Sequence, residues 1–192
     1  MKNPGAIILA AGKGSRIGTP KIFLKIFDEY FVNIISEKLI SAGIFEICCV
    51  IAPETDVPKH SFNHQIKWSR NPQSENGMIS SIYWGVQFLK NCDGYLIVPV
   101  DHPSFQAKTI IDLKNSFLGN RFCAHKPIFE NRSGHPIIIP REVAVQIKPQ
   151  DYKGGLNQFL INSNCKIKYV ETNDPGILKN INTKHELEKV AL

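Results

Sequence analysis

The sequence predicts an α/β fold in which a mostly parallel sheet is covered by helices on both faces. Short apolar runs alternate with segments whose apolar residues recur at helical spacing, as in strand–helix–strand units. The runs are apolar throughout, which is typical of strands buried on both faces. The 192 residues, 43% of them hydrophobic, suffice for one domain with its own core.

The first half of the chain carries the clearest elements. Strands are predicted at apolar runs bounded by glycine, proline or polar residues: Ala6–Ala10, Ile47–Ala52, a weaker Gln65–Trp68, and Tyr95–Val100. Helices are predicted where apolar residues lie three or four apart: Phe31 to Ala42 with a stop at Gly43, Ile79 to Leu89, and Ile110 to Phe117.

The pattern weakens from Arg121 onward. Strands are predicted at 135–139 and 166–170, a short helix at 155–161, and a terminal helix at 183–190. The sequence has no internal repeat, low-complexity tract or linker, so residues 1–192 are predicted to form a single domain. Ligands of open parallel sheets bind beyond the carboxyl ends of the strands. Chemistry is therefore expected just after Leu9, Ile51 and Val100.

The net charge of +6 favours an anionic partner. No nucleic acid is expected, because the basic residues are not interleaved with aromatic ones as in single-strand binders. No membrane association is expected, because no apolar run approaches the roughly 20 residues of a spanning helix. The five cysteines are odd in number and lack a C-x-x-C pair, so reduced thiols and a cytoplasmic protein are expected.

A glycine-rich loop follows the first predicted strand, with the sequence LAAGKGSRIGTPK over residues 9–21. Its glycines allow a sharp turn that presents N–H groups to an anion, Ser15 adds a donor, and Arg16 and Lys21 add charge. A Walker-type phosphate loop does not match, because Lys21 lies between proline and isoleucine. A dinucleotide fingerprint does not match either, because its last glycine falls one residue late. A glycine-rich turn with solvated charges remains the alternative.

Five segments in order resemble one known family. They are Leu9-Ala10-Ala11-Gly12-x-x-Ser15-Arg16-x-Gly18-x-x-Lys21, Asn71 with Gly77-Met78-x-Ser80-Ser81, Val98-Pro99-Val100-Asp101-His102-Pro103, Gly134-His135-Pro136, and Asp174-Pro175-Gly176 with Asn180-Ile181-Asn182-Thr183. Together they resemble the nucleotidyltransferases that transfer a nucleoside monophosphate from an NTP. Within these, the chain is most similar to the molybdenum cofactor cytidylyltransferase type.

This resemblance implies a Rossmann-like three-layer sandwich of the nucleotide-diphospho-sugar transferase type. Residues 1–105 would bind the NTP, and residues 106–192 would bind the acceptor. The implied nucleotide-binding residues are Leu9, Ala10, Ala11, Gly12, Gly14, Ser15, Asn71, Gly77, Ser80 and Ser81. The implied catalytic residues are Lys21, Arg16 and Asp101, and the implied acceptor-binding residues are Gly134, His135 and Pro136. In the family, Ala10-Ala11 in the loop together with Gly-His-Pro is associated with cytidine transfer rather than guanosine transfer. The resemblance therefore implies CTP as the substrate.

Asp101 ends a wholly apolar strand, where a carboxylate has no structural reason to lie. Mg²⁺ uses few carboxylates and otherwise takes water and phosphate oxygens, so a single acid suits it. The alternative is a helix N-cap, for which Ser104 is the better placed residue. The family pattern would add a second carboxylate near the C-terminus, but Asn180 and Asn182 stand there. Their amide oxygens remain possible ligands, and the sequence does not decide which is nearer the metal.

The resulting functional hypothesis is a Mg²⁺-dependent transfer of CMP from CTP to a phosphorylated acceptor, molybdopterin being favoured, with release of pyrophosphate. A sugar or polyol phosphate is the alternative acceptor. A CTP-binding regulatory protein that lost catalysis is the alternative class, because two asparagines replace the acids. The partners would be small-molecule substrates, with a molybdoenzyme or chaperone as a further partner.

Overall fold

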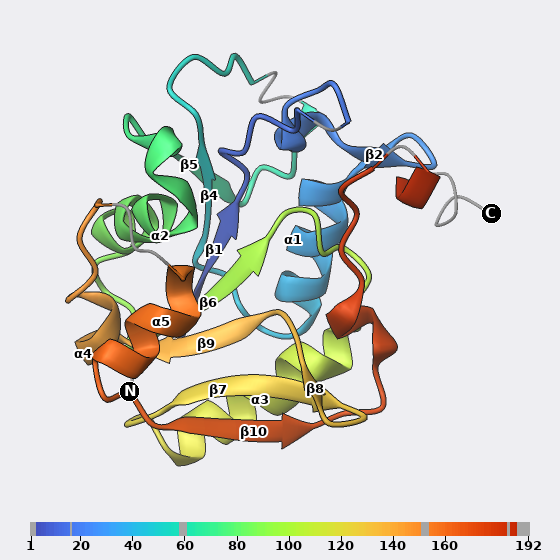
Figure 1. Ribbon diagram of the computed structural model, residues 1–192. Coiled ribbons are helices and arrows are strands. Elements are labelled where there is room, and N and C mark those ends of the chain that lie inside the picture. The colour runs from blue at the N-terminus through green and yellow to red at the C-terminus, as the bar shows by residue number, and fades with distance from the viewer. Residues whose placement is uncertain (1–2, 16, 58–60, 151–153, 184, 188–192) are drawn as a thin grey trace.

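The computed structural model describes residues 3–15, 17–57, 61–150, 154–183 and 185–187. One twisted sheet crosses the molecule, and helices cover both of its faces (Figure 1). Alternate residues of the central strand point to opposite faces. Ala6 and Ile8 enter one apolar cluster, and Ile7 and Leu9 enter the other. The predicted three-layer α/β sandwich is confirmed.

The strands lie in the order β10-β7-β9-β6-β1-β4-β5, and a short β8 pairs with β7. Their bounds are β1 Gly5–Leu9, β4 Ile47–Ile51, β5 Ile66–Arg70, β6 Gly94–Pro99, β7 Ala124–Phe129, β8 Arg132–Ser133, β9 Ile137–Pro140 and β10 Ile167–Glu171. A separate two-stranded ribbon joins β2 Lys25–Ile26 to β3 Glu29–Tyr30. Strands β6, β1, β4 and β5 run parallel, whereas β9 is antiparallel to β6 and β7.

Helices α1 (Phe31–Ser41) and α3 (Ala107–Gly119) pack on one face of the sheet. Helices α2 (Gly77–Phe88), α4 (Arg141–Ala144) and α5 (Gly155–Asn162) pack on the other (Figure 1). None of the helices in the described ranges is long and apolar enough to cross a membrane.

The sequence pattern missed strand β7. Its interior residues His125 and Lys126 are polar but buried, so they interrupt the apolar run that marks the other strands. The predicted strand at 135–139 begins two residues later, at Ile137. The terminal helix expected at 183–190 is described only at 185–187, where Thr183 and Glu186 exchange hydrogen bonds in a capping box.

The assignment of Ser104 as a helix cap is wrong. Helix α3 begins at Ala107, and its start is held by the distant Asp174, which is 2% exposed. The Asp174 carboxylate accepts hydrogen bonds from the Gln106 amide at 2.6 Å and from the Thr109 hydroxyl at 2.6 Å. This carboxylate therefore ties the C-terminal segment to α3, next to the end of β6.

Candidate active site

The glycine-rich loop folds back on itself after β1. The Lys21 amide donates to the Gly12 carbonyl at 3.1 Å, and the Ile17 amide donates to the Gly14 carbonyl at 2.9 Å. Gly14 has φ +60°, and a Cβ there would lie 1.9 Å from the Thr19 carbonyl oxygen, so only glycine fits. This fold returns Lys21 to the end of β1.

Five consecutive loop amides, from Ala11 to Ser15, donate to no residue in the described ranges. Gly12 to Ser15 line a hollow of about 410 Å³, together with Lys21, Asp101, Asn180 and Asn182. Free amides around a concavity form a site for an anion, and Lys21 adds a full positive charge. Arg16, the other predicted cation of the loop, lies outside the described residues.

Lys21 joins the two halves of the chain. Its ammonium lies 2.5 Å from Asp101 Oδ2 and 3.0 Å from Asn182 Oδ1, to which it donates. Asp101 is 6% exposed, so its carboxylate is withdrawn from water and meets the ammonium at the mouth of the hollow. The sequence expectation that Lys21 and Asp101 share a site matches this geometry.

The C-terminal segment is pinned beside Asp101. The buried Ile181 donates its amide to the Asp101 carbonyl at 2.9 Å, and the flanking Asn180 and Asn182 both line the hollow. The sequence left open which asparagine lies nearer to the metal. Asn182 shares the Lys21 ammonium with Asp101, so it is the nearer candidate ligand.

The segment after β5 is arranged differently from a simple base-binding site. The Asn71 side-chain amide donates to the Ser80 and Ser81 hydroxyls, each at 2.9 Å, and its carbonyl oxygen accepts from the Gln73 amide. The Ser80 hydroxyl lies 2.8 Å from the Gln73 and Gly77 carbonyl oxygens. Asn71 and Ser80 are both fully buried, so these bonds fix the start of α2. Gly77 and Ser81 line a hollow of about 220 Å³ and remain available to a ligand.

Comparison with known proteins decides the family. The model of the MobA-like NTP transferase domain matches residues 6–167. The chain belongs to this family. A relative from Bacillus mycoides, described as a probable molybdenum cofactor guanylyltransferase, is 26% identical and aligns with 97% of this chain and 94% of that one.

Two solved structures share the fold of this NTP transferase domain. One is molybdopterin-guanine dinucleotide biosynthesis protein A from Archaeoglobus fulgidus, with a TM-score of 0.74, 16% identity, and coverage of 97% of this chain and 96% of that one. The other is a Mycobacterium tuberculosis H37Rv protein in complex with manganese, with a TM-score of 0.73, 13% identity, and coverage of 98% of both chains.

The Gly134-His135-Pro136 segment of this family member packs against the C-terminal segment. A Cβ on Gly134 would lie 2.1 Å from the Ile177 carbonyl oxygen, and the His135 amide donates to that oxygen at 3.0 Å. The His135 ring meets the His102 ring edge to face, with 5.0 Å between centroids. Since His102 follows Asp101, this ring contact places His135 close to Asp101, and His135 also lines a hollow of about 260 Å³ with Lys126 and Gly134.

Stability should fall in acid because His135 is held neutral. Burial lowers the pKa of His135 to about 3, and His102 and Lys126 act in the same direction while Asp101 opposes them. The ordinary value in an unfolded chain is about 6.5. The folded state therefore binds this proton only at a lower pH than the unfolded state does. The contribution of neutral His135 to the free energy of unfolding is fully present above pH ~6.5 and is lost as pH falls toward 3. We expect a slope of about 1.4 kcal/mol per pH unit from this residue.

Urea unfolding at pH 7 and pH 4.5 measures this slope, and His135→Gln should flatten it. The exposed His64 provides the matched control, His64→Gln, which should leave the slope as in the wild type. Equal slopes in the wild type and in His135→Gln would contradict the prediction.

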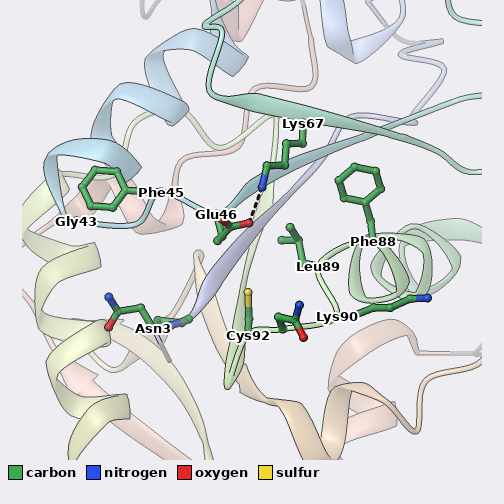
Figure 2. A pocket seen from close by; sticks show the side chains of 11 residues that line it. Asn3, Gly43, Phe45, Glu46, Lys67, Phe88, Leu89, Lys90 and Cys92 are labelled. Atoms are coloured by element: carbon green, nitrogen blue, oxygen red, sulfur yellow. Dashed lines mark hydrogen bonds and ion pairs between the residues drawn. The ribbon is translucent and has the colours of Figure 1, made fainter. Parts of the chain in front are cut away.

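A larger hollow, of about 550 Å³, lies at the opposite edge of the sheet (Figure 2). Figure 2 shows the Lys67–Glu46 ion pair across it, at 2.7 Å, and Cys92 beneath. Burial raises the pKa of the Cys92 thiol, which makes it a poor nucleophile. This hollow lies at the amino ends of β1 and β4, whereas ligands of such sheets bind at the carboxyl ends. The volume of a hollow therefore does not by itself identify the functional site.

Proposed function

We propose that this protein transfers CMP from CTP to a phosphorylated acceptor, with molybdopterin as the favoured acceptor, and releases pyrophosphate. The observation that carries the proposal is the Lys21 ammonium between Asp101 and Asn182, facing the free amides of the glycine-rich loop. The family membership and the description of the Bacillus relative support nucleotidyl transfer and the acceptor. The five reduced thiols support a cytoplasmic location.

In the proposed mechanism the loop amides of Ala11 to Ser15 hold the β- and γ-phosphates. A phosphate oxygen of the acceptor attacks the α-phosphorus, a new P–O–P bond forms, and the bond to pyrophosphate breaks. Lys21, aided by Arg16, stabilises the negative charge that gathers on the α-phosphate and on the leaving group. No covalent enzyme intermediate is required, since positioning and charge neutralisation supply the catalysis.

The residues beside Lys21 suit Mg²⁺. Asp101 offers one carboxylate, and Asn182 and Asn180 offer amide oxygens, while the remaining positions would be taken by water and phosphate oxygens. When bound, the cation would neutralise phosphate charge. The described ranges hold no cluster of three acidic, histidine or cysteine side chains that could bind a metal ion. A bound cation would therefore need phosphate oxygens of the nucleotide among its ligands.

The choice of CTP rests on the loop. Ala11 is 7% exposed and lines the 220 Å³ hollow. We assign the base to this hollow, where the Ala11 methyl group would narrow the space for it. We expect kcat/KM for CTP to exceed that for GTP by about tenfold or more, as size exclusion typically gives. Ala11→Gly should raise the relative use of GTP. Pyrophosphate release with CTP, GTP and UTP, tested with molybdopterin and with sugar or polyol phosphates, measures both.

Each outcome of that assay is informative. A preference for GTP would agree with the description of the Bacillus relative and would overturn the cytidylyl part of the proposal. Turnover with a sugar or polyol phosphate alone would overturn the acceptor. No turnover with any pair would overturn the transfer.

The asparagines favour a second candidate, a CTP-binding regulatory protein. Asn182 carries no charge where the family pattern would place an acid, so a cation is held less tightly. Asn182→Asp should lower the metal concentration for half-maximal pyrophosphate release about tenfold, because a charged ligand replaces a neutral one. Asn162, which is exposed on α5 far from the hollow, provides the control, Asn162→Asp. Activity that appears only in Asn182→Asp would favour the regulatory protein.

A further inference from the structure

Lys126 on β7 is buried, with 7% of its surface exposed. Neighbouring residues of a strand point to opposite faces. His125 bonds Ser116 and Asn120 on the α3 side, and Lys126 points to the α5 side. There its ammonium donates to Asn157 Oδ1 at 2.8 Å. The sequence pattern did not indicate a role for this lysine, because β7 was not predicted.

The Lys126 ammonium lacks a negative partner among the described residues, since no carboxylate there lies within 4.0 Å of it. An ammonium has three protons to donate, and Asn157 accepts one. Burial lowers the pKa of Lys126, which shows the cost of holding this charge away from water. A buried, uncompensated charge is unfavourable for folding alone, so its position indicates a ligand.

Lys126 lines a hollow of about 260 Å³. Gly154 and Gly155 form its far wall, and both have positive φ, at 88° and 60°. A Cβ on Gly155 would meet no atom within 4 Å, so the space before α5 is open. Gly154, the N-cap, offers no side chain to the helix start. The positive end of the α5 dipole and the ammonium thus face the same space, which favours an anion.

This hollow continues toward the catalytic residues. Met78 lines it and also lines the two hollows beside Lys21 and Asp101. His135 lines it as well, and its ring contacts that of His102. The two histidines therefore separate the Lys126 hollow from Asp101, while Met78 borders both spaces.

We propose that the Lys126 hollow binds a second anionic group of the acceptor, apart from the phosphate whose oxygen reacts. This rests on the proposed nucleotidyl transfer, and it names the acceptor class as a molecule with two anionic groups. Lys126 and the α5 amides hold the remote group, and the reacting phosphate extends past Met78 toward Lys21. Lys126 acts as a specificity residue and takes no part in the bond changes.

Inorganic phosphate serves as the probe in a titration followed by the backbone amide signals of the glycines. We expect the signals of Gly154 and Gly155 to shift, and the dissociation constant that they report to rise about tenfold or more in Lys126→Met. Lys168→Met removes an exposed charge from the neighbouring β10 and should change nothing. Gly12 and Gly14 report on the loop in the same spectra and should respond alike in all three proteins.

Two results would overturn the proposal: no shift of Gly154 and Gly155 in the wild type, or an unchanged dissociation constant in Lys126→Met. If the amide signals of Gly12 and Gly14 do not shift with phosphate, the result would instead count against the proposed function. It would not contradict phosphate binding in the Lys126 hollow. Thermal unfolding without phosphate gives a further readout. Lys126→Met should unfold at or above the wild-type temperature because a buried charge is removed. A clearly lower temperature would assign the lysine a structural role and overturn the proposal.

Discussion

Replacement of Lys21 by methionine should reduce turnover about 10²–10³-fold, the effect typical of losing one preorganised charge partner of a transition state. Methionine keeps much of the aliphatic chain that passes over Gly12, where a Cβ would lie 3.2 Å from Lys21 Cδ. The loop should therefore fold as before. In the proposed mechanism the lost charge is the one that stabilises the leaving pyrophosphate, and Asp101 is left buried without its cation.

Pyrophosphate release measures turnover, and calorimetric titration with CTP measures affinity. Lys25→Met is the control, because Lys25 is exposed on β2 and packs over the Tyr30 ring. The turnover of Lys25→Met should stay within about twofold of the wild-type value. Lys21→Arg should not restore activity, since a guanidinium cannot reproduce the point contact with both Asp101 and Asn182. A Lys21→Met enzyme as active as Lys25→Met would remove the basis of the proposed mechanism.

The fold was predictable because the central strands are buried on both faces. Such strands show as unbroken apolar runs, so Gly5–Leu9, Ile47–Ile51 and Gly94–Pro99 were located to within a residue or two. Strand β7 was not predictable in this way. His125 and Lys126 are buried there because Asn120, Ser116 and Asn157 bond them, and these partners are apparent only in three dimensions.

The position of Lys21 beside Asp101 in the candidate site was predictable for a related reason. Lys21 and Asp101 follow the ends of adjacent parallel strands, and such ends meet at one edge of a sheet. The roles of Asn71 and Ser80 were less accessible, because the sequence shows polar groups but not whether they bond one another. Asp174 was missed as an anchor, although its Asp-Pro-Gly sequence indicates a turn.

Loss of the Asp174 carboxylate should be the most destabilising single change outside the apolar core. Asp174→Ala removes the acceptor of three donors, the amides of Gln106 and Gly176 and the Thr109 hydroxyl, which lie 2.6–2.9 Å from the Asp174 oxygens. Of the three, the Gly176 and Thr109 hydrogen bonds are buried. A buried donor left without an acceptor costs about 1–3 kcal/mol, so the combined loss should be about 3–5 kcal/mol. The negative charge of Asp174 also raises the pKa of Lys38, which burial lowers. Asp174→Ala would therefore also remove an interaction that stabilises the charged form of Lys38.

Urea unfolding measures the loss, and Asp112→Ala is the matched control. Asp112 pairs with the exposed Lys108 one helical turn away on α3, and such a pair contributes about 0.3–0.5 kcal/mol. Asp174→Asn should lie between the two, because an amide oxygen still accepts but carries no charge. The activity of the Asp174 variants should fall by more than the fraction of unfolded protein accounts for. Asp174 anchors the segment that brings Asn182 to Lys21, so Asp174→Asn, assayed where it remains folded, should require more metal for half-maximal pyrophosphate release. A loss in Asp174→Ala no greater than in Asp112→Ala would show that the C-terminal segment is held beside Asp101 by the Ile181 contact alone.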